Sequence, residues 1–268
     1  MRAKDIRDKA DGESITMLTA YDAPTAKVVD EAGIDIILVG DSLGNTQLGY
    51  DSTLPVTVDE MASHTAAVAR ATENALVLAD MPFLSYGADR GEAIENCGRM
   101  LKEANADGVK LESGPHTVEL TERLVALGIP VQAHLGLTPQ HENETGLFRQ
   151  GTDMEGAEEI LELAEAHEAA GAFSLVLEHV PTNLAAAVSK RLSIPTIGIG
   201  AGPDCDGQVL VVDEVIGRST DTAPFSRSWG DVRGEMERAV AGYKEDVESG
   251  EFPAEEHTHH ESGVEDVY

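Results

Sequence analysis

Short apolar runs alternate with amphipathic segments along most of this chain of 268 residues. The clearest run, residues 34–39, is too short for a typical helix and is flanked by glycines, which predicts a strand buried on both faces. Runs of this kind predict eight strands, at residues 15–22, 34–39, 75–82, 108–114, 130–137, 173–180, 196–202 and 208–215. Amphipathic segments predict helices at residues 25–32, 57–71, 92–106, 118–127, 154–170, 184–192 and 232–248.

The alternation of strands and helices, repeated about eight times, is typical of a (β/α)8 TIM barrel. We therefore expect one α/β barrel domain over residues 1–252, followed by an acidic, disordered tail at residues 253–268. A doubly wound open sheet is the alternative fold. That fold usually has a glycine-rich phosphate turn after its first strand, whereas residues 20–25 read AYDAPT. The GIGAG at residues 198–202 comes too late and is too short to be a dinucleotide fingerprint.

One connection is longer than the others. Residues 138–151, after the fifth predicted strand, form a polar stretch with no periodicity. A loop of this length inside a compact domain is usually functional, so we expect it to cover an active site.

The charge balance narrows the classes of partner. The formal net charge is -30, from 49 acidic and 19 basic side chains. Nucleic acid and anionic membranes are therefore not expected as partners, because their phosphates would be repelled. Hydrophobic residues still make up 41% of the chain, which argues against disorder. We interpret the composition as an acidic shell over an ordinary core, as in proteins that work in high salt.

Cysteine content and hydropathy predict the compartment. The two cysteines, Cys97 and Cys205, are too few for a disulfide framework, which fits a reducing cytoplasm. Neither a signal-peptide core at the N-terminus nor a run long enough to span a membrane is present in the sequence. We therefore expect a soluble, cytoplasmic protein.

Four acidic residues fall at the C-terminal ends of predicted strands: Asp41, Asp80, Glu112 and Glu178. In a barrel these ends converge on the face where active sites lie. Asp and Glu are seldom buried unless they are paired or bound to metal, so four converging acids suggest a cation between them. Carboxylate oxygens without clustered Cys or His favour Mg²⁺ over zinc. Asp41, taken alone, could equally cap a helix or turn.

Two further polar side chains belong to the predicted strands. Lys110 and Glu112 are two residues apart, so their side chains point the same way. Lys110 could hold an anionic substrate, or it could only neutralise Glu112. His134, on the fifth predicted strand, could polarise a substrate oxygen, or it could be a hydrogen-bonded histidine of the barrel wall.

Six motifs carry a resemblance to a known family. They are GDSLG at 40–44, ADMPF at 79–83, VKLE at 109–112, HLGLTPQ at 134–140, VLEHVP at 176–181 and IPTIGIGAGPDCDGQVLV at 194–211. In this order they closely resemble the ketopantoate (3-methyl-2-oxobutanoate) hydroxymethyltransferase family. The resemblance extends from the MLTAYD at residue 17 to the EFP near residue 252. Together with the acidic composition, it indicates a salt-adapted member of haloarchaeal type.

The resemblance implies an activity, a cofactor and an assembly. It implies an enzyme that transfers a hydroxymethyl group from 5,10-methylenetetrahydrofolate, its cosubstrate, to 3-methyl-2-oxobutanoate (alpha-ketoisovalerate). The product is 2-dehydropantoate, on the route to pantothenate and coenzyme A. It also implies one Mg²⁺ per subunit and a large homo-oligomeric ring, such as a decamer.

The resemblance also assigns roles to matching residues. Asp41 and Asp80 match the family's metal ligands, and Glu112 matches a third that acts directly or through a water molecule. Ser42 and Lys110 match the residues that hold the oxo acid, with Asp41 and Asp80 also close to it. Glu178 matches the proton acceptor, which would remove the proton from carbon 3 of the oxo acid. His134 remains an accessory candidate.

Two alternatives remain. Mg²⁺-dependent lyases and mutases of 2-oxo acids use the same type of barrel, but those that look alike tend to keep a Cys in a flexible loop after about the fourth strand, and the sequence has none there. A catalytically silent binding barrel is the second alternative, and it should have lost some of the acids, whereas none is missing.

Overall fold

The computed structural model describes residues 1–9, 12–220 and 222–261. Eight parallel strands close into a barrel in chain order, with β1 paired to β8. The strands are β1 (Ile15–Thr19), β2 (Ile36–Val39), β3 (Leu76–Asp80), β4 (Gly108–Glu112), β5 (Val131–Gly136), β6 (Ser174–Glu178), β7 (Thr196–Ile199) and β8 (Gly207–Leu210). The predicted (β/α)8 barrel is confirmed.

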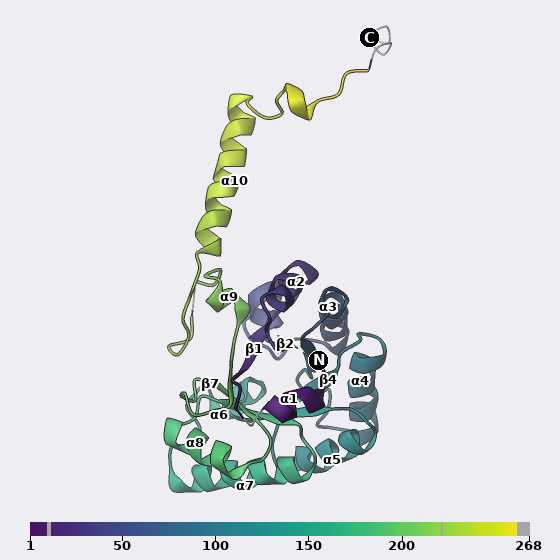
Figure 1. Ribbon diagram of the computed structural model, residues 1–268, viewed down its shortest axis with the longest axis vertical. Coiled ribbons are helices and arrows are strands. Elements are labelled where there is room, and N and C mark those ends of the chain that lie inside the picture. The colour runs from purple at the N-terminus through teal and green to yellow at the C-terminus, as the bar shows by residue number, and fades with distance from the viewer. Residues whose placement is uncertain (10–11, 221, 262–268) are drawn as a thin grey trace. The chain divides into compact units, whose positions relative to one another are not determined.

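Helices lie between most of the strands. The α-helices are α1 (Ala3–Lys9), α2 (Ala23–Glu31), α3 (Val58–Ala71), α4 (Arg90–Lys102), α5 (Val118–Ala126), α6 (Glu142–Thr145), α7 (Met154–Ala169), α8 (Thr182–Arg191), α9 (Val212–Val215) and α10 (Val232–Ser249). Figure 1 shows helices such as α3, α4, α5, α7 and α8 on the outside of the strands. A π-helix, η1, covers Gly44–Leu48, and 3-10 turns cover η2 (Pro115–Thr117), η3 (Pro139–His141) and η4 (Glu255–His257). Helix α3 begins with a reciprocal capping box, in which Glu60 N donates to Thr57 Oγ1 and Thr57 N donates to Glu60 Oε2.

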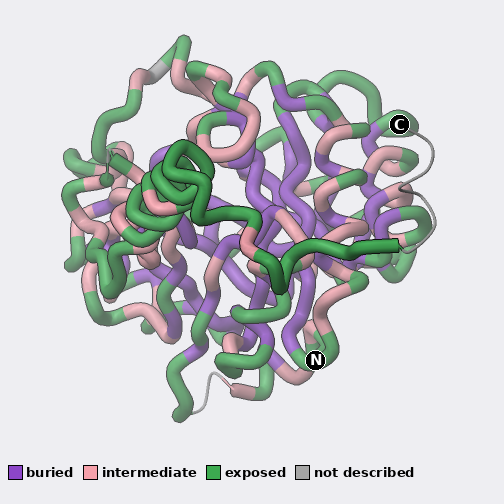
Figure 2. The backbone as a smooth tube through the Cα atoms, turned by 90° about the horizontal axis from the view of Figure 1, so that it is seen from above, coloured by how far each residue is buried: buried purple, intermediate pink, exposed green. Residues whose placement is uncertain are grey.

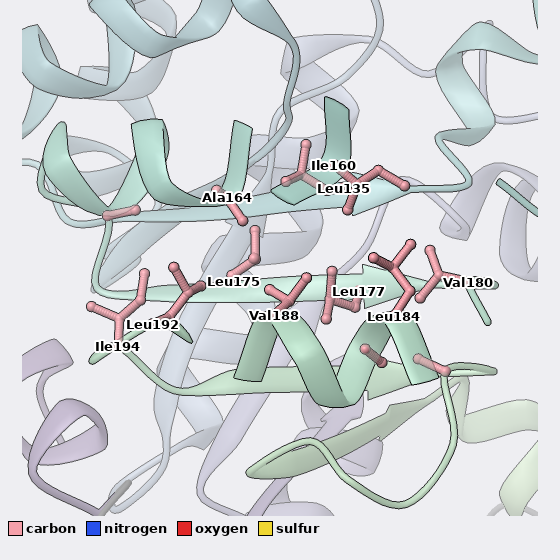
Figure 3. Close-up of a cluster of buried hydrophobic side chains, with 14 residues drawn as sticks. Leu135, Ile160, Ala164, Leu175, Leu177, Val180, Leu184, Val188, Leu192 and Ile194 are labelled. Atoms are coloured by element: carbon pink, nitrogen blue, oxygen red, sulfur yellow. The ribbon is translucent and has the colours of Figure 1, made fainter. Parts of the chain in front are cut away.

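The buried side chains form clusters on both faces of the strands. One cluster includes Met17, Ile36 and Val209 from strands around the barrel. Another joins the outer faces of β5 and β6 to α7 and α8, with Leu135, Leu177 and other aliphatic side chains in contact (Figure 3). Burial of this apolar surface is the main driving force for closing the barrel. Accordingly, most strand residues are buried, and Figure 2 shows buried segments mainly in the interior and exposed segments mainly around the outside.

Some acidic residues support the fold at the opposite ends of the strands from the predicted site. Asp35 Oδ2 accepts from Thr16 N (2.9 Å), and Asp206 Oδ2 accepts from Thr196 N (2.7 Å). Asp107 likewise accepts from Val77 N (2.8 Å). Each carboxylate satisfies a backbone donor where a strand begins, so these acids have a structural role.

The structure differs from the predicted elements in a few places. The run at residues 208–215 was predicted as one strand, but β8 ends at Leu210 and a short helix, α9, follows. The strand is shorter than predicted because Val212 N donates to the side-chain hydroxyl of Thr19 (2.9 Å). In addition, Asp213 and Glu214 favour the first turn of a helix. Helix α1 and the π-helix η1 were not predicted. The polar loop at 138–151 contains η3 and α6.

The described chain divides into two compact units. The first comprises residues 1–212 and 223–226 and contains the barrel. The second comprises residues 213–222 and 227 onward, and it contains α10. The domain boundary expected at residue 252 and the disordered tail stay predictions, and residues 262–268 of that tail lie outside the described residues. Among the helices of the described chain, none is long and apolar enough to cross a membrane.

Candidate active site

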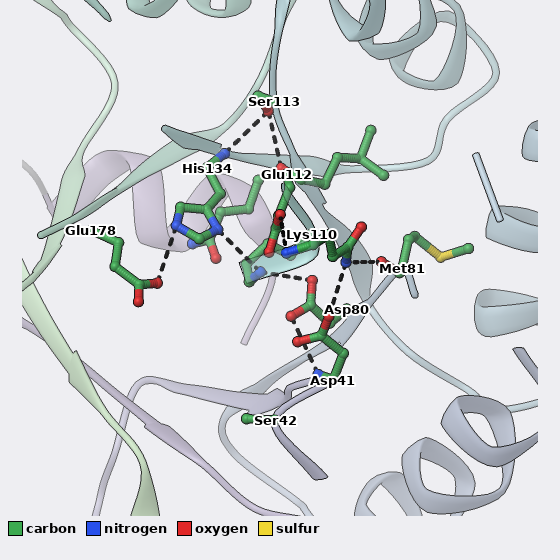
Figure 4. A network of polar contacts seen from close by, with 12 residues as sticks. Asp41, Ser42, Asp80, Met81, Lys110, Glu112, Ser113, His134 and Glu178 are labelled. Carbon is green, nitrogen blue, oxygen red and sulfur yellow. Dashed lines mark hydrogen bonds and ion pairs between the residues drawn. The ribbon is translucent and has the colours of Figure 1, made fainter. Parts of the chain in front are cut away.

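Three of the four predicted acids meet at the C-terminal ends of adjacent strands (Figure 4). Asp41 follows β2, Asp80 ends β3 and Glu112 ends β4. The buried apolar residues of each strand fix its register, and this register pairs Asp80 with Lys110 and Glu112 with His134. All five side chains are at least nine-tenths buried.

A pocket of about 110 Å³, partly open to solvent, lies in the barrel mouth. Its polar lining contains every site residue that the sequence predicted: Asp41, Ser42, Asp80, Lys110, Glu112, His134 and Glu178. Its apolar lining is aliphatic and includes Met17, Leu38, Val176, Ile199, Val209 and Leu210. The pocket therefore combines a charged side with an aliphatic side, as a small organic acid would require.

Lys110 is the cation of this cluster. Its Nζ donates to Asp80 Oδ1 (2.7 Å), so the direct contact is with Asp80 and not with Glu112. Burial alone lowers the pKa of Lys110, but the charges of Asp80, Asp41 and Glu112 outweigh it, and the net pKa is raised. Lys110 therefore stays positively charged in the pocket.

The surroundings of Asp41 disfavour the charged form of its carboxyl group. Its pKa is raised well above the usual value, first by burial and then by the like charges of Asp80 and Glu112. Its backbone N donates to Asp80 Oδ2 (3.4 Å), and its own Oδ2 accepts from Gln140 Nε2 (2.9 Å). Three acids thus face one ammonium group, and a bound cation would relieve their repulsion.

The chemistry of the donors fits a hard cation such as Mg²⁺. Asp41 and Asp80 offer carboxylate oxygens from neighbouring strand ends, and Mg²⁺ is commonly held by one or two carboxylates together with water and substrate oxygens. Within the described residues, no three His, Cys, Asp or Glu side chains are grouped closely enough to hold a metal by themselves. Glu112 lies beside this pair, and its Oε2 accepts from Gln140 N (3.0 Å).

Glu178 and His134 form a second pair in the pocket wall. His134 Nε2 lies 3.2 Å from Glu178 Oε2, and His134 Nδ1 lies 3.5 Å from Lys110 Nζ. Because an ammonium group can only donate, Nδ1 is the acceptor and Nε2 carries the proton. Within the described part of the chain, Nε2 has no aligned hydrogen-bond partner although it is buried. That donor is therefore placed to bind Glu178 or a substrate oxygen.

Three polar side chains near the acids were not predicted as site residues. Gln140 and Tyr86 are buried beside Asp41 and Glu112 and are linked by a 2.8 Å hydrogen bond. Thr53 lines the pocket, and its buried hydroxyl has no hydrogen-bond partner among the described residues. The sequence signal for Gln140 was its position in HLGLTPQ, at the start of the long polar loop. Ser42, which was predicted, shares a 2.9 Å hydrogen bond with the Tyr21 hydroxyl.

A closed (β/α)8 barrel with charged residues from consecutive strand ends around a small pocket is the arrangement of (β/α)8-barrel enzymes, whose active sites lie at this end of the barrel. Among solved structures, the phosphoenolpyruvate phosphomutase from Streptomyces platensis subsp. rosaceus shares this fold, with a TM-score of 0.62 and 15% identity over 93% of this chain and 88% of that chain. At this identity the likeness concerns the fold alone.

Sequence comparison defines the family. The model of the ketopantoate hydroxymethyltransferase family matches residues 1–255. The 3-methyl-2-oxobutanoate hydroxymethyltransferase of Natronomonas pharaonis is 74% identical over 268 residues, which is all of both chains. The enzyme of the same name from Halobacterium salinarum is 66% identical over 257 residues, or 96% of this chain and 94% of that one. The chain belongs to the ketopantoate hydroxymethyltransferase family, and the predicted haloarchaeal type is confirmed by these relatives.

Proposed function

We propose that this protein transfers a hydroxymethyl group from 5,10-methylenetetrahydrofolate to 3-methyl-2-oxobutanoate and forms 2-dehydropantoate for pantothenate synthesis. The single observation that carries the proposal is the pocket. It contains two acids that are suited to holding a cation, Asp41 and Asp80. It also contains a charged lysine and a separate carboxylate, Glu178. Membership of the family, at 74% identity to a relative of that name, supports the choice of substrate.

The pocket is suited to a branched 2-oxo acid. Lys110 and Ser42 are proposed to hold the substrate carboxylate, because an ammonium group and a hydroxyl are the donors that a carboxylate needs. The aliphatic lining, including Val176 and Ile199, suits the two methyl groups on carbon 3. The buried Nε2–H of His134 is available to the keto oxygen or to Glu178.

Asp41 and Asp80 are proposed to hold one Mg²⁺, with Glu112 acting through a water molecule. The ion would polarise the keto group and stabilise negative charge on its oxygen during deprotonation. The two aspartates come from strand ends that are neighbours in the sheet, so their orientation does not depend on a mobile loop.

Glu178 is proposed as the general base. It ends β6 and approaches the pocket from a different side than the acids on β2 to β4. The carboxylate takes the proton from carbon 3, and the resulting carbanion equivalent forms a carbon–carbon bond to the methylene carbon of the folate. Both carbon–nitrogen bonds of the folate methylene group break, and one water molecule supplies the hydroxyl group of the product. The second proton of that water and the proton taken from carbon 3 end on the two folate nitrogens, so that tetrahydrofolate leaves. The side chain is partly exposed, with 18% of its surface accessible, so it can return its proton to solvent.

Product formation tests the proposal. Purified protein in molar KCl receives 3-methyl-2-oxobutanoate, 5,10-methylenetetrahydrofolate and Mg²⁺, and 2-dehydropantoate is followed by mass spectrometry. The expected result is product that requires all three additions and is lost in Glu178→Gln. Cleavage or rearrangement of a 2-oxo acid without folate would instead indicate a lyase or mutase. No turnover of any of these substrates, with intact folding, would favour a silent binding barrel.

The predicted assembly and compartment remain proposals of the same kind. A homo-oligomer, with a decamer as the expected size, a cytoplasmic location and small molecules as the main ligands fit a metabolic enzyme of this family. Sedimentation of the purified protein in molar KCl would measure the oligomer size directly.

A further inference from the structure

We propose that Gln140 is a positioning residue for the cation site, and that Tyr86 holds it in place. The inference rests on the proposed role of Asp41 as a cation ligand. Gln140 lies in η3, at the start of the long polar loop after β5, and only 4% of its surface is exposed. It contacts groups at the ends of β2, β3 and β4, which makes it a bridge between three strand ends.

The hydrogen bonds fix the orientation of the side-chain amide. Nε2 donates to Met81 O (2.8 Å) and to Asp41 Oδ2 (2.9 Å), which uses both of its protons. Because the Met81 carbonyl can only accept, the amide nitrogen and not the oxygen must face it. The second N–H then points at Asp41, so a neutral donor occupies Oδ2 and leaves Oδ1 for another ligand.

The backbone of the same residue holds a second acid. Gln140 N donates to Glu112 Oε2 (3.0 Å). One residue therefore orients Asp41 through its side chain and Glu112 through its main chain. The two carboxylates are buried close to each other, so like charges on them would repel. Without these two donors the carboxylates would be free to turn away from each other.

Tyr86 completes the arrangement from the loop after β3. Its hydroxyl donates to Gln140 Oε1 (2.8 Å) and lies 3.3 Å from Glu112 O. The side chain is 8% exposed. Because the hydroxyl binds the amide oxygen, it opposes rotation of the amide and keeps Nε2 on Asp41. Groups that orient metal-binding residues in this way typically change metal affinity by about 10- to 100-fold when they are removed.

The test is a calorimetric titration of the full chain with Mg²⁺ alone in molar KCl. Gln140→Leu keeps the volume but removes the amide, and we expect the dissociation constant for Mg²⁺ to rise by about tenfold or more. Tyr86→Phe removes only the hydroxyl and should weaken binding less. Gln150→Leu is the matched control, because Gln150 lies in the same loop and its side chain donates to Phe148 O (2.9 Å). We expect its affinity to equal that of the wild type.

A double-mutant cycle separates positioning from a general loss of structure. If Tyr86 acts through Gln140, Tyr86→Phe has no further effect on Mg²⁺ affinity in the Gln140→Leu background. Melting temperatures of all variants show which of them are folded, and if Gln140→Leu does not fold, Tyr86→Phe carries the test alone. Wild-type Mg²⁺ affinity in folded Gln140→Leu would overturn the inference. If that variant does not fold, wild-type affinity in Tyr86→Phe would overturn it. Additive effects of the two changes on Mg²⁺ affinity would also overturn it.

The titration contains no oxo acid or folate, so it is independent of the proposed reaction. Weakened Mg²⁺ binding in Gln140→Leu, together with no product from the wild type, would overturn the proposed function and support the positioning role. Product from the wild type, with unchanged Mg²⁺ binding in Gln140→Leu, would support the proposed function and overturn the positioning role. Wild-type protein that binds no Mg²⁺ would overturn the inference whatever the product assay gives.

Discussion

His134 Nε2 lies 3.2 Å from Glu178 Oε2, and both atoms face the pocket in the barrel mouth. The contact joins β5 to β6, while the other ring nitrogen of His134 faces Lys110 Nζ at 3.5 Å. The imidazole therefore connects the Lys110 ammonium group to the proposed base. With Nδ1 accepting from Lys110, an N–H rather than a lone pair lies next to the Glu178 carboxylate.

This relationship predicts different effects for two amides at position 134. The Nε2 of a glutamine reaches about as far as the donor nitrogen of His134, whereas the Nδ2 of an asparagine reaches only to the level of Nδ1. We expect His134→Asn to lower kcat about tenfold more than His134→Gln, because only the longer amide restores a donor near Glu178. Steady-state kinetics at saturating oxo acid measures the difference. Equal kcat values would show that the Nε2 donor has no part in the reaction.

The acid pair predicts a metal dependence with a matched control. Asp41→Asn and Asp80→Asn keep the shape of each side chain but remove its charge, so oxo acid binding should lose its dependence on Mg²⁺. Calorimetry of 3-methyl-2-oxobutanoate with and without Mg²⁺ measures this. Asp204→Asn, an exposed aspartate outside the pocket, should behave as the wild type does. The proposed cation site would be wrong if all three variants bound the oxo acid equally well.

The net charge of -30 predicts a dependence of stability on salt. At about 0.01 M salt the screening length is roughly 30 Å, so acidic side chains repel one another across much of the surface. The melting temperature should therefore rise steeply between low salt and molar KCl. Changing the exposed residues Glu155, Glu158 and Glu162 of α7 to Gln should make the rise smaller. A melting temperature that is the same in low and molar salt would contradict a salt-adapted surface.

His167 predicts a dependence of stability on pH. It is fully buried in α7, and burial lowers its pKa to about 4. The unfolded chain binds a proton near pH 6.5, so the free energy of unfolding should fall by about 3 kcal/mol as the pH falls from 6.5 to 4. Above pH 6.5 this contribution is complete. Denaturant titrations should show the free energy of unfolding falling more steeply with decreasing pH in the wild type than in His167→Gln. An equal pH dependence in the two proteins would rule the effect out.

The sequence predicted those features that depend on strand periodicity. Asp41, Asp80, Glu112 and Glu178 each end an apolar run, and parallel strands of a barrel bring such ends together. This reasoning located the acids, Lys110 and His134 without knowledge of any contact. The end of the last strand was harder to predict, because the apolar run around Val212 is compatible with both a strand and a short helix.

The contacts between loops could not be predicted in the same way. Gln140 and Tyr86 are 54 residues apart, and their hydrogen bond depends on how two irregular segments fold over the strand ends. Thr53 is a polar residue in a loop, and its burial in the pocket has no signature in periodicity. Irregular backbone follows from the whole packed barrel rather than from local propensity, so side chains in these loops were missed.

Exchange of the carbon-3 hydrogen of 3-methyl-2-oxobutanoate in D₂O tests the central claim most directly, because it isolates the step assigned to Glu178. The sample contains enzyme, Mg²⁺ and oxo acid in molar KCl without folate, and proton NMR follows the loss of the carbon-3 signal. The wild type should exchange this hydrogen, and Glu178→Gln should do so at least about 100-fold more slowly while binding the oxo acid normally. Undiminished exchange in Glu178→Gln would contradict the account and would place the base elsewhere, first at His134.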